Sequence, residues 1–415
     1  MSFFARPFAS RVGASATSLC EAHGCLVADG LRSAAYRRWP DPTPIALSYV
    51  TGPATPQDQL AIARWRLHSQ HLAGTPAIDA VAVVRRLLAV QAENHAQASW
   101  AVGARCHTPD AALFVRLYND GAILRTHLLR PTWHFVLPDD IGWLLDLSRP
   151  RLLRGWERQL EQEGITHALW ERAATVIATA LTGQQLTRAE LANHLADAGF
   201  NFSGHALMLV AGLTEVHGLV CSGPTRDSQH TYALFTERVP KTRRLEPDAA
   251  RAELVARYVA GHGPVTERDV AYWATMTLRD VRVGLADIAD RLSSFELDGD
   301  TFWHTTGAPD GSTIEPRAHL LQILDEYYRG YQHTRGLLDI AGQMVAGRED
   351  SIGMAIIDSQ LVGGMNRTIG REYVTFDIRP LRDLTDDETV AIHDAAARYG
   401  HFLNRTPRLT FSNTR

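Results

Sequence analysis

An amide and a carboxylate stand two residues apart in the segment Gln91-Ala92-Glu93. Hydrolysis of a glycosidic bond needs a polar group that positions a water molecule and a negative charge that stabilises an oxocarbenium-like sugar. Gln91 and Glu93 could supply both if their side chains point the same way. Residues i and i+2 lie about 200° apart on a helix, but they share one face of an extended segment. We therefore expect the segment where a preceding helix ends; the alternative is that both residues only cap or solvate that end.

A second polar pair with the same spacing occurs in Thr132-Trp133-His134. On a strand, Thr132 and His134 point to one face. A neutral imidazole there can orient water or donate to phosphate, and a hydroxyl can bind phosphate. Trp133 points to the opposite face, which predicts a core position. His127 lies on the expected partner strand, either as a companion of His134 or as an ordinary packed residue. The alternative for His134 is a structural role, in which its ring only makes hydrogen bonds within the hairpin.

Arginines provide the candidate phosphate contacts. Arg125 and Arg130 flank the expected hairpin. A dense basic cluster, without an acid among its seven positions, contains Arg238, Lys241, Arg243 and Arg244. Such a run is typical of a patch that binds a nucleic-acid backbone, and the alternative is a solvated linker. Lys241 is the only lysine among 42 basic residues, so a Schiff-base mechanism has one candidate, and its place in a loop argues against that mechanism.

The composition is that of an ordinary globular protein. The chain has 415 residues, of which 45% are hydrophobic and 21% charged, with a formal net charge of −4. This length predicts roughly three domains. No run of about 18 apolar residues occurs, so no transmembrane helix is predicted. The four cysteines are too few and too scattered for a disulfide framework or a zinc site, so we expect no metal and a reducing cytoplasm; they are Cys20, Cys25, Cys106 and Cys221.

The order of the predicted elements repeats along the chain, which indicates an α+β fold with three tandem winged helix-turn-helix units. In the first unit, helices are expected from Pro56, from about Ile78 and from Thr108, followed by a β-hairpin over residues 122–136. Capping boxes mark later helix starts, such as Thr187-Arg188-Ala189-Glu190. The three units are predicted to span residues 55–165, 166–247 and 248–306.

The two ends of the chain differ from the repeated part. Residues 1–54 show no sustained periodicity, which predicts a disordered or mis-assigned N-terminal extension. Residues 307–415 predict a small β-barrel-like domain with one packed helix. Within it, residues 318–331 are expected to be helical, and strands are expected to follow over residues 354–378.

The chain resembles the winged-helix AlkZ/YcaQ family of DNA glycosylases over about residues 56–413. Each of the motifs that carry the resemblance is weakly specific alone, but five occur in the right order. They are Arg66-Leu67-x-x-Gln70-x-Leu72, Val90-Gln91-Ala92-Glu93, Arg125-Thr126-His127-Leu128-Leu129-Arg130-Pro131-Thr132-Trp133-His134, Leu320-Leu321-x-x-x-Asp325-Glu326-Tyr327 with Gly330-Tyr331, and Leu361-Val362-Gly363-Gly364.

The resemblance implies three winged helices around a DNA-sized cleft and a C-terminal β-barrel-like domain. It implies monofunctional excision of N-alkylated purines from double-stranded DNA, including the unhooking of interstrand crosslinks, with no cofactor. Gln91 and Glu93 match the family's Gln-x-Gln or Gln-x-Asp motif, except that glutamate takes the last position. Glutamate keeps the charge of the aspartate form and adds one methylene, roughly 1.5 Å of reach. Asp325-Glu326-Tyr327 is expected to anchor a helix rather than to do chemistry.

Two functions from different classes follow. One is a DNA glycosylase that acts as a monomer. The other is a non-catalytic winged-helix DNA-binding protein, such as a regulator or a self-resistance binder, because a fold does not fix a function. A regulator needs a dimer and spaced half-sites, whereas three winged helices in one chain favour a monomeric clamp. An enzyme releases a free base, and a binder only shifts the mobility of DNA.

Overall fold

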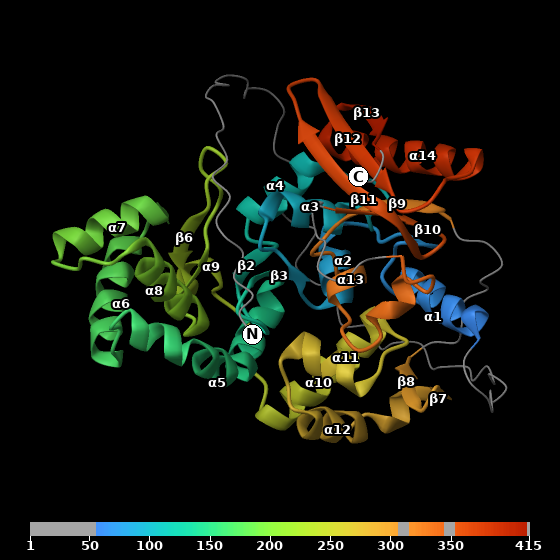
Figure 1. Cartoon of the computed structure of the whole chain (residues 1–415). Helices are drawn as coiled ribbons and strands as arrows, with labels where there is room; N and C mark the ends of the chain where they lie inside the picture. Colours follow the sequence, from blue (N-terminus) through green and yellow to red (C-terminus); the bar gives the residue numbers. More distant parts are fainter. Residues whose placement is uncertain (1–54, 306–314, 344–352, 413–415) are drawn as a thin grey trace. The chain divides into compact units, whose positions relative to one another are not determined.

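The computed structural model describes residues 55–305, 315–343 and 353–412, which form a mixed α+β chain (Figure 1). The extension expected at residues 1–54 lies outside the described residues. The first described helix is α1 (Pro56–Ser69), which begins with a capping box between Thr55 and Asp58. In the part of the chain that the structure describes, no helix is long and apolar enough to cross a membrane.

One order of elements occurs three times: a helix, a short strand or bridge, two more helices and a β-hairpin. The first repeat comprises α2 (Ala80–Leu87), β1 (Val90–Gln91), α3 (His95–Gly103), α4 (Ala111–Asn119), β2 (Leu124–His127) and β3 (Trp133–Val136). The second repeat comprises α6 (His167–Leu181), β4 (Leu186–Thr187), α7 (Arg188–Asp197), α8 (Gly204–Val216), β5 (Val220–Ser222) and β6 (Thr231–Leu234). The third repeat comprises α10 (Pro247–His262), α11 (Glu267–Ala274), α12 (Leu278–Ala286), β7 (Ser293–Leu297) and β8 (Asp300–His304).

In each repeat the short strand or bridge pairs with the second strand of the hairpin. The sheet orders are β1-β3-β2 in the first repeat and β4-β6-β5 in the second. In the third repeat, the strand is reduced to Val265, which forms a bridge to Trp303. The repeats are joined by α5 (Pro138–Gln162) and by the short helix α9 (Phe235–Arg238), and the 3-10 turn η1 (Ala289–Arg291) precedes the last hairpin.

The helices of the first repeat differ from the expected ones. Helix α1 lies ahead of the repeat, and α3, which the sequence patterns do not predict, takes the second place. Asn94, directly after Glu93, begins α3, because its side chain accepts a hydrogen bond from the backbone N–H of Gln97. The segment Gln91-Ala92-Glu93 therefore connects two helices.

The C-terminal part is built on one five-stranded sheet, with the order β13-β12-β11-β10-β9. Helix α14 (Asp386–Leu403) links β12 to the parallel strand β13 and packs beside the sheet (Figure 1). In the described residues no pairing joins the outer strands β9 and β13, so the expected β-barrel-like domain is not confirmed. The strands are β9 (Ala318–Gln322), β10 (Gly353–Ile357), β11 (Gln360–Ile369), β12 (Tyr373–Pro380) and β13 (Thr406–Phe411).

The prediction of a helix over residues 318–331 is wrong. The segment contains strand β9, the short helix α13 (Glu326–Arg329) and, further on, the 3-10 turn η2 (Arg335–Leu338). All five residues of β9 are buried, because other parts of the chain cover both faces of this strand. A strand buried on both faces shows no alternation of apolar and polar residues, so its run of apolar residues resembles that of a helix.

Side chains from distant segments hold the first repeat in place. Trp100 of α3 stacks on Tyr399 of α14, with ring centroids 4.1 Å apart, and its indole N–H donates to the carbonyl of Leu320. Arg105 forms a bidentate ion pair with Asp325, with nitrogen–oxygen distances of 2.7 and 3.0 Å, and both side chains are fully buried. The first repeat is thus tied to the segment that carries α13.

Candidate active site

The segment Gln91-Ala92-Glu93 is shaped by a sharp change of direction after α2. Leu88, the residue after this helix, has φ of 67°, a left-handed value that leucine rarely adopts. Its side chain is fully buried in a hydrophobic core, which holds the turn in place. The chain then runs into β1, where Gln91 pairs with His134 of β3. Strand β1 ends at Gln91, and Glu93 lies in the bend between β1 and α3.

Three polar side chains lie on one face of the sheet β1-β3-β2, and a fourth, that of Thr132, lies just ahead of β3. His134 is paired with Gln91 on one side and with Thr126 on the other, and Thr132 precedes His134 by two residues. We call Gln91, Thr126, Thr132 and His134 the polar row. In the described part of the chain, the side-chain oxygens of Gln91, Thr126 and Thr132 are buried without a hydrogen-bond partner. Buried polar atoms are normally satisfied, so these oxygens are suited to bind water or a polar group of a substrate.

His134 is a neutral imidazole in this environment. Its side chain is fully buried, and burial, together with the charge of Arg130, lowers its pKa to about 3. Its Nδ1 donates to the carbonyl of Thr132 at 3.0 Å, which leaves Nε2 as an acceptor 3.5 Å from the guanidinium of Arg130. His134 can therefore orient a water or a donor group, but it is not an imidazolium near neutral pH and has no second proton to give.

The carboxylate of Glu93 is exposed and faces the start of β3. Its Oε2 accepts a hydrogen bond from the backbone N–H of Trp133 at 3.3 Å. The peptide groups beside it are held by Arg125, whose Nε donates to the carbonyl of Ala92 at 2.9 Å and whose Nη2 donates to the carbonyl of Glu93 at 3.1 Å. The guanidinium of Arg125 also lies over the ring of Trp133, 4.3 Å from its centroid.

These contacts change the interpretation of two residues. Arg125 is 5% exposed, so a phosphate contact would require its side chain to leave both carbonyls. Trp133 was expected in the core, but it is only partly buried. Its indole instead bridges Arg125 and a buried carboxylate, that of Glu215, which the sequence patterns do not single out.

Glu326 contacts the segment Gln91-Ala92-Glu93, whereas the sequence predicted only that it anchors a helix. Its Oε1 accepts from the backbone N–H of Gln91 at 2.9 Å, and its Oε2 accepts from the indole of Trp273 at 2.8 Å and from His262 at 3.4 Å. Burial opposes its charge, but the hydrogen bond from His262 and the charge of Arg130 outweigh burial and lower the pKa of Glu326 to about 2. Glu326 is thus an ionised carboxylate that contacts the backbone of Gln91, whereas its neighbour Asp325 has the expected anchoring contact with Arg105.

Arg130 joins this group. One terminal nitrogen lies 3.9 Å from Glu326, and the other donates to the carbonyl of Arg329 at 3.1 Å. Its Nε is buried without a partner among the described residues. Of the expected arginines of the hairpin, Arg130 is therefore placed beside His134 with a donor atom available.

The basic cluster is placed differently. Arg238 donates to the carbonyl of Tyr118 on α4 at 2.7 Å. Arg243 pairs with Glu253 of α10 and Arg244 pairs with Asp146 of α5. These partners hold the segment before α10 against the helices, and Lys241 is exposed. The named partners lie on helices, not on the strands that carry the polar row.

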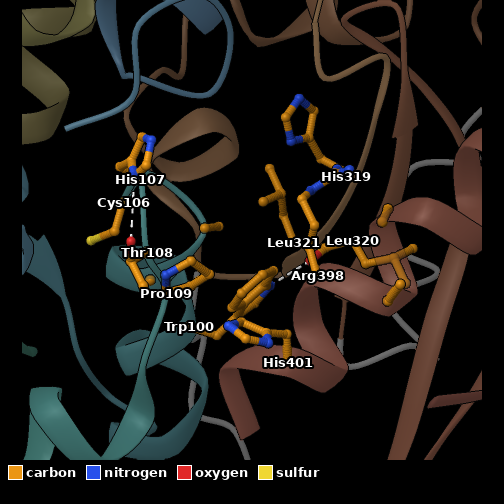
Figure 2. A pocket seen from close by; sticks show the side chains of 14 residues that line it. Trp100, Cys106, His107, Thr108, Pro109, His319, Leu320, Leu321, Arg398 and His401 are labelled. Carbon is orange, nitrogen blue, oxygen red and sulfur yellow. Dashed lines mark hydrogen bonds between the residues drawn. The ribbon is translucent and has the colours of Figure 1, made fainter. Parts of the chain in front are cut away.

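Figure 2 shows a pocket lined by α3 and the segment after it, by β9 and by α14. Its lining includes Trp100, His107, His319, Arg398 and His401, and none of the polar-row residues. In the described ranges, no group of three or more histidine, cysteine, aspartate or glutamate side chains could hold a metal ion.

Comparison with known proteins identifies the family. The family model described as "DNA glycosylase AlkZ-like" matches residues 84–402, which is more than half of the chain and runs from the second half of α2 into the last turn of α14. The chain belongs to the AlkZ-like DNA glycosylase family. This AlkZ-like enzyme is 27% identical over 283 residues to the interstrand DNA cross-link repair glycosylase of Streptomyces sahachiroi, covering 64% of this chain and 75% of that protein.

A solved structure agrees with the fold of this AlkZ-like glycosylase. The DNA glycosylase AlkZ of Streptomyces sahachiroi superposes with a TM-score of 0.67 at 21% sequence identity. The match covers 88% of this chain and 100% of that chain. The likeness extends over the repeats and the C-terminal sheet together.

Proposed function

We propose that this AlkZ-like glycosylase hydrolyses the N-glycosidic bond of N-alkylated purines in double-stranded DNA and can unhook interstrand crosslinks. The family membership supports the reaction type, and the name of the Streptomyces relative, an interstrand DNA cross-link repair glycosylase, supports crosslinks as a substrate class. An alkylated purine carries a positive charge and is already a good leaving group, so the enzyme needs little general acid. A neutral His134 beside the site fits this requirement.

In this proposal, Gln91 and Glu93 form the catalytic pair. The observation that carries it is the unpartnered, buried side-chain oxygen of Gln91 close in sequence to the exposed carboxylate of Glu93. The Gln91 oxygen would accept a hydrogen bond from the attacking water. Glu93 would take up the proton of that water as a general base, or stabilise the positive charge that develops on the sugar.

We infer that each repeat is a winged helix-turn-helix unit, since each has a helix, a short strand or bridge, two helices and a hairpin in that order. Thr132, His134 and Arg130 would contact DNA next to the catalytic pair. Lys241 and Arg244, the exposed members of the basic cluster, would contact the backbone elsewhere. Three such units in one chain support action as a monomer.

The proposal is tested by incubation of methylated duplex DNA with the protein. Release of free 7-methylguanine with intact abasic sites supports a monofunctional glycosylase, and borohydride should trap no adduct between protein and DNA. A crosslinked duplex of defined sequence tests unhooking in the same assay. Retarded mobility of DNA without release of any base would instead support a non-catalytic DNA-binding protein, the alternative that the glutamate at position 93 keeps open.

A further inference from the structure

A buried carboxylate of the second repeat touches the hairpin of the first. Glu215 lies near the end of α8 and has no exposed surface. It accepts hydrogen bonds from the indole N–H of Trp133, at 3.1 and 3.2 Å, and from Nδ1 of His127. A carboxylate without such partners is costly to bury. Both donors belong to the first repeat, so the charge of Glu215 bears on the position of that hairpin.

The contacts continue from Trp133 to the catalytic pair. The indole ring lies against the guanidinium of Arg125 at 4.3 Å. Arg125 in turn donates to the carbonyls of Ala92 and Glu93, and the backbone N–H of Trp133 donates to the Glu93 carboxylate. The second repeat makes another contact with Arg125: the hydroxyl of Ser222 accepts a hydrogen bond from the backbone N–H of Arg125 at 2.8 Å.

We propose that Glu215 is a positioning residue for the glycosylase reaction: through Trp133 and Arg125 it sets the place of the Glu93 carboxylate. This inference rests on the proposed function of Glu93. A hydrogen bond to an ionised acceptor is about twice as strong as a neutral one, so Glu215 fixes the plane of the indole. The fixed indole then supports the guanidinium that holds the peptide groups around Glu93. A misplacement of about 1 Å at a catalytic group can cost about 100-fold in rate.

Three variants and one control test this inference in the full-length chain. Glu215→Gln keeps the size of the side chain and removes its charge. Trp133→Phe keeps an aromatic ring against Arg125 and removes the indole N–H; the third variant combines both substitutions. Glu388→Gln is the control, because Glu388 is also a buried carboxylate, but it pairs with Arg382 at the start of α14.

Four quantities are measured: the single-turnover rate of 7-methylguanine release, the Kd for duplex DNA, the midpoint of thermal unfolding and the indole N–H signals in NMR spectra. Trp133→Phe assigns the Trp133 signal. We expect Glu215→Gln to lower the rate about 10-fold or more, to leave the Kd within about two-fold, and to shift the Trp133 signal. The double variant should be no slower than the slower single variant, since both act through one contact. Glu388→Gln should leave rate and signal unchanged.

Two results would overturn the inference while the proposed function stands. One is a wild-type rate for Glu215→Gln in spite of a shifted Trp133 signal. The other is a double variant whose loss equals the product of the single losses, which would indicate independent, merely structural effects. Absence of base release by the wild-type protein would instead overturn the proposed function, and the positioning role with it. If Glu215→Gln fails to fold, Trp133→Phe alone decides: a wild-type rate for it rejects the role of this contact.

Discussion

Arg125 holds the two peptide groups that flank Glu93, through the carbonyls of Ala92 and Glu93. Two donors of one planar group reach two consecutive carbonyls, a geometry that arginine offers and lysine does not. The sequence places Arg125 beside a hairpin, where a phosphate contact is the natural expectation. In the structure the guanidinium instead holds the backbone around Glu93. A phosphate contact and this positioning of the backbone predict different effects of substitution.

Replacement of Arg125 by lysine keeps the charge and removes the fork. We expect Arg125→Lys to slow single-turnover excision about 10-fold or more, because the Glu93 backbone loses one of its two donors. The Kd for DNA and its salt dependence should stay close to the wild-type values. Arg408→Lys is the matched control, since Arg408 also lies against an aromatic ring, that of Tyr373 in β12 of the C-terminal sheet.

The opposite result would restore the phosphate contact. In that case Arg125→Lys or Arg125→Ala would weaken DNA binding, and the alanine variant would reduce the slope of log K against log salt concentration by about one. Excision at saturating protein would then remain at the wild-type rate.

At the scale of elements, the close approach of α10 to α2 sets where the site segment begins. Gly261 of α10 lies against the end of α2: a Cβ atom there would be 2.4 Å from the carbonyl oxygen of Arg86. Backbone atoms cannot yield to such a contact without moving the helix. The position of Gln91, four residues after Leu87, thus depends on a glycine in the third repeat.

A pair of glycine substitutions tests this dependence. Gly261→Ala should lower the free energy of unfolding by about 1–3 kcal/mol, because the added methyl group forces α2 and α10 apart. Gly155→Ala should raise it by roughly 0.5–1 kcal/mol, because Gly155 lies within α5 with no atom close to the added methyl group. Chemical denaturation measures both; a change of the same sign in the two variants would contradict the packing described here.

Elements with local signals could be predicted from the sequence, and those without could not. Capping boxes locate the starts of α7 and α11, and the turn at Asp298-Gly299 locates the hairpin β7–β8. Helix α3 has its signal, Asn94, directly after the site segment, where the same residue also fits a helix end. Strand β9 has no alternation to reveal it, because both of its faces are covered.

At the scale of the whole molecule, the site depends on contacts that no local pattern encodes. The spacing in Gln91-Ala92-Glu93 and in Thr132-Trp133-His134 singles out Gln91 and His134, which are neighbours on paired strands, and hairpin alternation could have added Thr126. The contact of Glu326 with Gln91 joins residues 235 positions apart. Glu215 comes from another repeat altogether. These residues become visible only when the repeats and the C-terminal segment are packed together.

Buried histidines make the stability of the whole chain depend on pH. Burial lowers the pKa of His134, His230 and His319 to about 3 and that of His95 to about 4. In the unfolded chain these groups take up protons near pH 6.5. Between about pH 6.5 and pH 3 the unfolded state therefore binds more protons than the folded state, so stability rises with pH in this window and is lost as the pH falls.

His319→Gln tests this dependence away from the polar row. The variant should reduce the slope of the unfolding free energy against pH near pH 5 by up to about 1.4 kcal/mol per pH unit, the contribution of one proton. The exposed His393 offers the control His393→Gln, which should keep the wild-type slope. The free energies come from denaturant titrations at several pH values. A slope that is the same in all three proteins would show that His319 is protonated in the folded chain.

The role of Glu93 is tested most directly by single-turnover release of 7-methylguanine from methylated duplex DNA, with wild type and Glu93→Gln compared side by side. Removal of a catalytic acid–base group costs about 10²-fold or more. We predict such a loss in Glu93→Gln with an unchanged Kd for DNA, because the amide keeps the size of the side chain and its contact with the Trp133 N–H. Excision at the wild-type rate by Glu93→Gln would contradict the assignment of Glu93 as the group that activates water.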